Sequence, residues 1–134
     1  LYVFITGKIS DPSRRYFQAD LNAYNVTDEK FNQIMQPIVD MDKDLKKRNI
    51  KFVVFLNPYE MQLRDKTEAN MMPQRKLARF FQKHEITYVD TTDRFKEFQS
   101  SADAFLFADP MHLSEAGHKT VFDALWENWQ RANN

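Results

Sequence analysis

The sequence predicts a single α/β domain, residues 1–134, in which helices cover both faces of a parallel sheet. Short apolar runs rich in β-branched and aromatic residues alternate with longer segments of helical periodicity. The runs are continuous rather than alternating between apolar and polar residues, which is typical of parallel strands buried on both faces. With 43% apolar residues among 134, the chain can bury one core. We therefore expect a three-layer α/β/α architecture.

Four apolar runs are the predicted strands. Residues 1–5 and 52–56 are the longer runs, and residues 86–89 and 105–107 are the shorter ones. Parallel strands need crossover connections, and the helical segments between these runs can provide them. Because the chain opens inside an apolar run and without a methionine, we expect a fragment from which earlier strands of the sheet are missing.

Two helices are predicted between the strands. Residues 27–45 place apolar side chains on one face, with Thr27 as the N-cap. Pro37 lies inside this segment, so we expect a kink or two abutting helices. A second helix begins at Pro73, since proline is favoured in the first turn. The polar stretch at residues 11–25 is long for a loop, and we expect a short helix or a substrate-facing excursion there.

A last helix is predicted at residues 115–130, with Ser114 as its N-cap. Apolar residues recur in this segment at helical spacing, and we expect that face to point inward. The residues expected to face inward are Val121, Phe122, Leu125 and Trp129. Trp126 and Trp129 are expected to pack this helix down onto the domain.

The composition argues against several classes of function. Lys and Arg total 19, as do Asp and Glu, so the chain lacks the excess positive charge that nucleic-acid binding needs. Gly7 and Gly117 are the only glycines, so neither a P-loop nor a dinucleotide-binding fingerprint can be written. The absence of cysteine excludes disulfides and thiolate chemistry. No apolar run approaches the about 20 residues that span a bilayer. We expect neither a nucleic-acid partner nor a membrane span.

Asp109 and His112 are the strongest candidates for chemistry. In open α/β sheets, ligands bind at the carboxyl ends of strands, and both residues follow the run at residues 105–107. A serine hydroxyl needs a base that accepts its proton, and the imidazole needs a carboxylate that fixes its tautomer. The two intervening residues, of which one is Pro110, allow a tight turn that brings the carboxylate onto Nδ1. This turn would leave Nε2 facing the cleft, and Ser114 would anchor it to the last helix.

The other histidines are weaker candidates. His118 could join Asp109 and His112 in a metal site, but it lies more than a helical turn beyond His112, and no further ligand accompanies them. His84 continues an apolar helix face and is expected to be structural. We therefore expect no metal.

Residues 109–118, D-P-M-H-L-S-E-A-G-H, resemble the C-terminal block of the SGNH (GDSL-like) hydrolase and acyltransferase superfamily. That block has D-x-x-H followed by a serine or threonine and then a glycine at the start of the last helix. Residues 1–7, 52–58 and 86–90 are similar to core strands of the family and the loops after them. The resemblance covers nearly all of this chain but only the C-terminal part of the family's domain.

The resemblance implies a flavodoxin-like fold and an ester hydrolase or O-acyltransferase that uses a Ser-His-Asp triad. Asp109 would be the orienting acid and His112 the general base, with the serine expected upstream. The substrate would be an acyl ester of a carbohydrate or lipid. No cofactor is implied. The resemblance also implies an extracytoplasmic location in a bacterium, which is common among members of the family.

The chain departs from the family pattern at two places. No G-D-S block is present, and Ile9 stands where the family's oxyanion-hole asparagine follows the glycine at position 7. Ser10 and Ser13 lie near that loop but outside a strand-to-helix elbow, so neither is a good nucleophile. The weaker candidates for an oxyanion hole or pocket are Gly7, Ser10, Asn57 and Tyr59.

These departures leave two alternatives open. One alternative is that the chain is a non-catalytic binding or assembly domain on an SGNH-like fold, because fold alone does not guarantee activity. Otherwise it pairs with a missing N-terminal segment or a separate chain that donates the serine and the absent strands.

Overall fold

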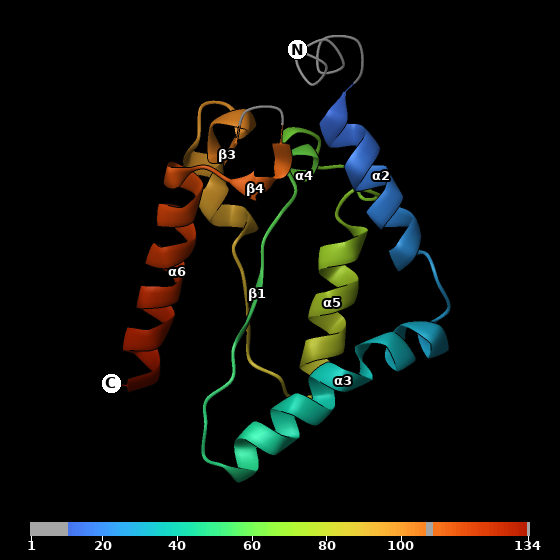
Figure 1. Ribbon diagram of the computed structural model, residues 1–134, viewed down its shortest axis with the longest axis vertical. Helices are drawn as coiled ribbons and strands as arrows, with labels where there is room; N and C mark the ends of the chain where they lie inside the picture. The colour runs from blue at the N-terminus through green and yellow to red at the C-terminus, as the bar shows by residue number, and fades with distance from the viewer. Residues whose placement is uncertain (1–10, 107–108, 134) are drawn as a thin grey trace.

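The computed structural model describes residues 11–106 and 109–133, which are mostly helical (65%) (Figure 1). The helices are α2 (Pro12–Tyr24), α3 (Asp28–Lys47), α4 (Glu60–Arg64), α5 (Met72–Lys83) and α6 (Glu115–Asn133), with short 3-10 helices η1 (Thr92–Glu97) and η2 (Ser101–Ala104). The strands are β1 (Val54–Leu56), β2 (Tyr88–Asp90), β3 (Phe105–Leu106) and β4 (Asp109–Leu113).

The predicted three-layer fold on a parallel sheet is wrong for the residues that the structure describes. β1 and β2 pair in parallel over three residues, from Val54 opposite Tyr88 to Leu56 opposite Asp90. β3 and β4 form a separate antiparallel pair. A continuous apolar run favours burial of a segment, but it does not show whether helices or a wide sheet bury it. Phe52 illustrates this, since it precedes β1 and packs against the helical core. The run at residues 1–5 lies outside the described residues.

α2 and α3 begin at side-chain caps that their sequences supply. The Asp11 carboxylate accepts from the backbone N–H of Arg14 at 3.1 Å, which starts α2 in the stretch expected to hold a loop or short helix. The Thr27 hydroxyl accepts from the N–H of Lys30 at 3.3 Å and starts α3. α3 continues through Pro37 as one element, so two abutting helices are not formed. Pro37 is exposed, which keeps its ring away from the core.

α3 and α5 end in the same C-terminal motif. Asn49 and Glu85 each adopt a left-handed conformation with φ of 55°. The N–H groups of Ile50 and Ile86 then donate to the carbonyl five residues earlier, at 2.9 and 3.0 Å. This turn ends each helix and leads the chain into the segment before β1 or β2.

The larger of two buried clusters lies between α3, α5 and the parallel strands. Its fully buried members are Phe31, Val39, Leu56, Phe80, Phe81 and Ile86. The rings of Phe31 and Phe80 meet edge to face, with centroids 5.7 Å apart. This cluster fixes α3 against α5 and therefore shapes the surface between them.

A smaller cluster joins the β3–β4 pair to the neighbouring short helices and to α6. Its buried members are Phe95, Ala104 and Phe105, with Leu63, Phe98, Leu113 and Val121 packed around them. α6 packs against η1, η2 and β4. In Figure 1, α6 lies on the side of β1 opposite α5.

The predicted inward face of α6 is wrong for most of its residues. Phe122, Leu125, Trp126 and Trp129 are 58%, 45%, 51% and 56% exposed. Helical periodicity shows that α6 has an apolar face, but it does not identify what covers that face. Of the residues predicted to face inward, only Val121, next to the smaller cluster, is partly buried.

A candidate acid–base site at Asp109 and His112

The irregular pairing of β3 with β4 brings Asp109 and His112 together. Phe105 lies opposite Leu113, whereas Leu106 lies opposite Asp109. Residues 110–112 of β4 therefore have no counterpart on β3 and form a bulge. Bulges of this kind redirect side chains, and here the bulge provides the turn that the D-x-x-H spacing predicts.

The two oxygens of the Asp109 carboxylate have separate partners. Oδ1 accepts from the backbone N–H groups of Met111 and His112, both at 3.1 Å. Oδ2 lies 2.7 Å from Nδ1 of the His112 ring. In a neutral imidazole one nitrogen donates and the other accepts, so this contact places the proton on Nδ1 and leaves the lone pair on Nε2. The predicted contact between the two side chains is therefore present.

The environment of Asp109 favours its charged form. Burial raises the pKa of this carboxyl, but hydrogen bonds from the N–H groups of His112 and Met111 and from the His112 ring lower it, and the lowering prevails. The side chains of His112 and Asp109 are 70% and 36% exposed. With its pKa lowered, the Asp109 carboxyl is ionised at neutral pH, and at Nδ1 it stabilises the imidazolium that forms when Nε2 accepts a proton.

The N-terminal end of α6, which follows His112 in the sequence, holds this pair in place. The N–H of Ser114 donates to the carbonyl of Ala104 at 2.9 Å, and its hydroxyl donates to the carbonyl of Asp103 at 2.7 Å. The same hydroxyl accepts from the N–H of Gly117 at 3.2 Å, so Ser114 caps α6 as predicted. A Cβ at Gly117 would lie 2.2 Å from the carbonyl oxygen of Ala104. Only glycine therefore allows this close approach of helix and loop.

Asn57 and Tyr59 are engaged elsewhere in the molecule. The Asn57 amide oxygen accepts from the hydroxyl of Thr91 at 2.9 Å, which ties together the chain after β1 and after β2. The Tyr59 hydroxyl donates to the Asp20 carboxylate on α2. Burial and this hydrogen bond raise the pKa of Tyr59. Neither side chain is hydrogen-bonded to Asp109 or His112. The other two weak candidates, at positions 7 and 10, lie outside the described residues.

No serine hydroxyl within residues 11–106 and 109–133 is hydrogen-bonded to His112. Ser13 is buried on α2. The Ser101 hydroxyl donates to the buried Glu60 carboxylate at 2.5 Å, and Ser114 caps α6. The described residues thus supply a base and its orienting acid, and no serine hydroxyl among them is hydrogen-bonded to that base.

Comparison of the chain with protein-family models, with curated proteins and with solved structures finds no match. The resemblance to the SGNH superfamily therefore stays a prediction, and function is argued from the geometry of the site.

Two further findings bear on the kind of chemistry available. In the part of the chain that the structure describes, no three His, Asp or Glu side chains are grouped so that they could hold a metal ion. No helix among these residues is both long and apolar enough to cross a membrane. His84 packs on Phe80 with ring centroids 4.4 Å apart, which fits its predicted structural role.

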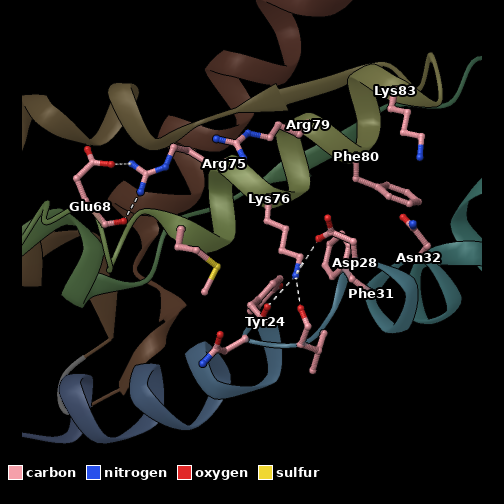
Figure 2. Close-up of a pocket in the computed structure, with 13 residues that line it drawn as sticks. Tyr24, Asp28, Phe31, Asn32, Glu68, Arg75, Lys76, Arg79, Phe80 and Lys83 are labelled. Carbon is pink, nitrogen blue, oxygen red and sulfur yellow. Dashed lines mark hydrogen bonds and ion pairs between the residues drawn. The ribbon is translucent and has the colours of Figure 1, made fainter.

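A pocket between α3 and α5 was not predicted from the sequence (Figure 2). Arg75, Arg79 and Lys83 contribute to its lining. Their spacing of four residues is visible in the sequence and was the signal for it, because residues four apart share one face of a helix.

Proposed function

We propose that Asp109 and His112 form the acid–base part of a site that hydrolyses acyl esters or transfers their acyl groups. The observation that carries the proposal is the 2.7 Å contact between Oδ2 of Asp109 and Nδ1 of His112, with the His112 ring largely exposed. An imidazole held in this tautomer leaves the lone pair of Nε2 able to accept a proton from a hydroxyl group that approaches the exposed ring. This arrangement is that of a general base.

In the proposed reaction, Nε2 of His112 accepts the proton of a serine hydroxyl while the serine oxygen attacks the ester carbonyl. Asp109 stabilises the imidazolium that forms, and its hydrogen-bonded carboxylate remains ionised. His112 then returns the proton to the leaving alcohol. Water or an acceptor alcohol releases the acyl group by the reverse sequence, which gives hydrolysis in one case and transfer in the other.

The serine would come from outside the described residues. The described serines, at positions 13, 100, 101 and 114, are buried or hydrogen-bonded to other groups. The family resemblance of residues 109–118 supports an upstream serine, and it supports carbohydrate or lipid esters as the class of substrate.

A second function, that of a non-catalytic binding or assembly domain, is favoured by one specific observation. The apolar stripe of α6 formed by Phe122, Leu125, Trp126 and Trp129 is about half exposed along its length. Contiguous exposed apolar side chains are typical of interaction surfaces. A protein of this second class would keep the Asp109–His112 contact without turning over esters.

Labelling with a fluorophosphonate separates the two functions. This reagent bonds its phosphorus to a serine oxygen when a histidine takes up the hydroxyl proton, and fluoride leaves. For the protein produced from its natural gene, we expect stoichiometric labelling of one serine, located by mass spectrometry of peptides. The reaction should be lost in His112→Gln, because no base then activates the hydroxyl.

His118→Gln is the matched control, since it removes an exposed histidine six residues away on α6. Labelling should survive in this variant. Absence of labelling in the wild-type protein, or labelling that persists without His112, would overturn the ester-processing function and leave the binding domain.

A further inference from the structure

One face of α6 is apolar and exposed over about two helical turns. It is the stripe of Phe122, Leu125, Trp126 and Trp129, whose exposed fractions lie between 45% and 58%. Ala124, on the other side of the helix, is only 4% exposed, so α6 packs through that side. The rings of Phe122 and Trp126 are nearly parallel, with an angle of 9° between their planes. The stripe is therefore a largely aromatic surface directed away from the packed side of the helix.

A basic segment, residues 43–51, adjoins the C-terminal end of this stripe. It holds five Lys or Arg residues and one Asp, in a chain whose formal net charge is zero. The Lys51 ammonium lies 6.0 Å from the centre of the Trp129 ring, and Lys51 and Asn128 line the same pocket. Ile50, which is 42% exposed, adds an apolar side chain at this place. Figure 1 shows the end of α3 and the C-terminal end of α6 on the same side of the molecule.

Residues 119–131 of α6 add no net charge to this surface. Asp123 is paired with Lys119 at 2.6 Å, and Glu127 is paired with both Arg94 and Arg131. The carboxylates beside the stripe are thus neutralised by cations of the protein itself. The basic segment therefore sets the sign of the charge next to the stripe.

Lys47 and Arg48 are exposed cations of the basic segment that a partner can reach. Lys47 lies 3.5 Å from the Asp44 carboxylate, but both side chains are at least 70% exposed, and such a pair is weak. Arg48 ends α3 through its backbone N–H, and its guanidinium forms no ion pair or hydrogen bond within residues 11–106 and 109–133. Both cations can therefore bind an anionic group without loss of a contact that holds the fold.

An aromatic stripe beside a basic segment matches the chemistry of a lipid–water interface. Helices that lie on membranes direct Trp, Phe and Leu toward the acyl chains, while nearby Lys and Arg contact anionic headgroups. Tryptophan suits this boundary because its ring is apolar and its indole N–H is polar. A second copy of the chain matches less well, since a two-fold interface would place the same positive charge on both sides.

We propose that the stripe and the basic segment together bind the surface of a bilayer that contains anionic phospholipids. α6 lies along this surface with the stripe between the headgroups and the acyl chains, and Lys47, Arg48 and Lys51 contact lipid phosphates. The proposal names a partner for the surface that favours a binding domain. It is independent of ester processing, because none of these residues belongs to the Asp109–His112 site.

The test mixes the protein with sucrose-loaded vesicles and measures the fraction that sediments with them. We expect binding to vesicles of phosphatidylcholine with about 30 mol% phosphatidylserine to be at least about tenfold stronger than binding to phosphatidylcholine alone. Added salt should weaken it, because salt screens the attraction to the headgroups. Since Trp126 and Trp129 are the only tryptophans, their fluorescence should shift to shorter wavelength as they leave water.

Two pairs of substitutions test the two parts of the surface. Trp126→Ser with Trp129→Ser removes apolar area from the stripe, and Lys47→Gln with Arg48→Gln removes two cations. Each pair should weaken binding to the anionic vesicles about tenfold. Arg79→Gln with Lys83→Gln is the matched control, because it makes the same charge change at exposed positions of α5, on the other side of β1. Binding should be nearly unchanged in this control, and circular dichroism checks that each variant folds.

Three results would overturn the proposal. The first is the absence of binding to anionic vesicles, and the second is equal weakening by the control pair, which would mean unspecific charge attraction. The third is a failure of acrylamide to quench the tryptophans before lipid is added, which would show that protein covers the stripe. Vesicle binding requires no serine and no turnover, so a failure of fluorophosphonate labelling would leave this proposal unaffected.

Discussion

The carboxylate of Asp109 has its oxygens committed to different groups, and this explains why aspartate suits the position. Oδ1 holds the backbone N–H groups of Met111 and His112, while Oδ2 contacts the imidazole. Asparagine could supply only one acceptor oxygen, and its amide would present a donor to Nδ1. The ring would then have to carry its proton on Nε2, which removes the lone pair that a general base needs.

Asp109→Asn is expected to reduce stability at neutral pH and to have no effect in acid. The pKa of Asp109 in the folded protein lies below its ordinary value, since backbone and ring hydrogen bonds to the ionised form outweigh burial. A lowered folded pKa adds stability above the unfolded value of about 3.9, and this contribution is lost as the pH falls through the folded value. Urea unfolding between pH 7 and pH 2.5 would measure the difference, which we expect to stay below about 1 kcal/mol at this exposed pair.

Asp103→Asn is the control for this prediction. Asp103 lies on η2, close to the site, and its exposed side chain makes no hydrogen bond or ion pair in the described structure. The Asp103→Asn substitution removes the same negative charge without removing a hydrogen-bond partner of another group. A difference between Asp109→Asn and wild type that is the same at every pH would contradict the assigned role of the ionised carboxylate.

Distance along the chain decides which site residues could be predicted. Asp109 and His112 are three residues apart, so the spacing alone indicated their contact. Asn57 and Tyr59 were plausible because they follow a strand. Their actual partners lie 34 and 39 residues away, at Thr91 and Asp20, and no local pattern reveals such pairs.

At the level of elements, the start of α6 depends on a glycine that a helix would otherwise disfavour. Gly117 is buried against the carbonyl of Ala104, which also accepts from the N–H of Ser114. This carbonyl joins the end of η2 to the helix cap. The position of α6 relative to β4, and with it the setting of His112, therefore depends on the absence of a side chain at residue 117.

Gly117→Ala is expected to destabilise the protein by about 1–3 kcal/mol. Alanine is a better helix former than glycine by about 1 kcal/mol, but its Cβ would lie 2.2 Å from backbone at Ala104 and 3.1 Å from Leu113. Backbone cannot rotate away as a flexible side chain would, so the clash outweighs the propensity. The midpoint of thermal or urea unfolding measures the change.

Gln130→Ala provides the comparison, since it introduces alanine at an exposed position of the same helix. Its unfolding midpoint should change little. A Gly117→Ala protein as stable as wild type would show that α6 and η2 do not approach each other this closely.

The helices were predictable where their signals are local, and the sheet was not. Thr27 and Ser114 cap helices as expected, and Pro73 lies in the first turn of α5. The number of strands that gather into one sheet depends on contacts between distant segments. The short parallel pair of β1 and β2 and the separate β3–β4 pair could not be inferred from apolar runs alone.

At the scale of the whole molecule, residues 11–106 and 109–133 bury two apolar clusters and leave an apolar stripe of α6 exposed. The larger cluster lies between α3, α5 and the parallel strands, and the smaller one holds the β3–β4 pair against the start of α6. Beyond Val121, the apolar stripe of α6 extends past the smaller cluster. The rings of Phe122 and Trp126 stack on this stripe with centroids 6.4 Å apart.

The fluorescence of the chain reports directly on this stripe, because its only two tryptophans are Trp126 and Trp129. They are 51% and 56% exposed, so acrylamide should quench both, and a single accessible population should describe the data. Trp126→Phe and Trp129→Phe each leave one reporter, and each should be quenched to a similar extent. A tryptophan that acrylamide does not reach would contradict the exposed stripe. In that case, dilution would show what covers the stripe. A second copy of the chain would dissociate on dilution and restore quenching, whereas a segment of the same chain would remain in place at any concentration.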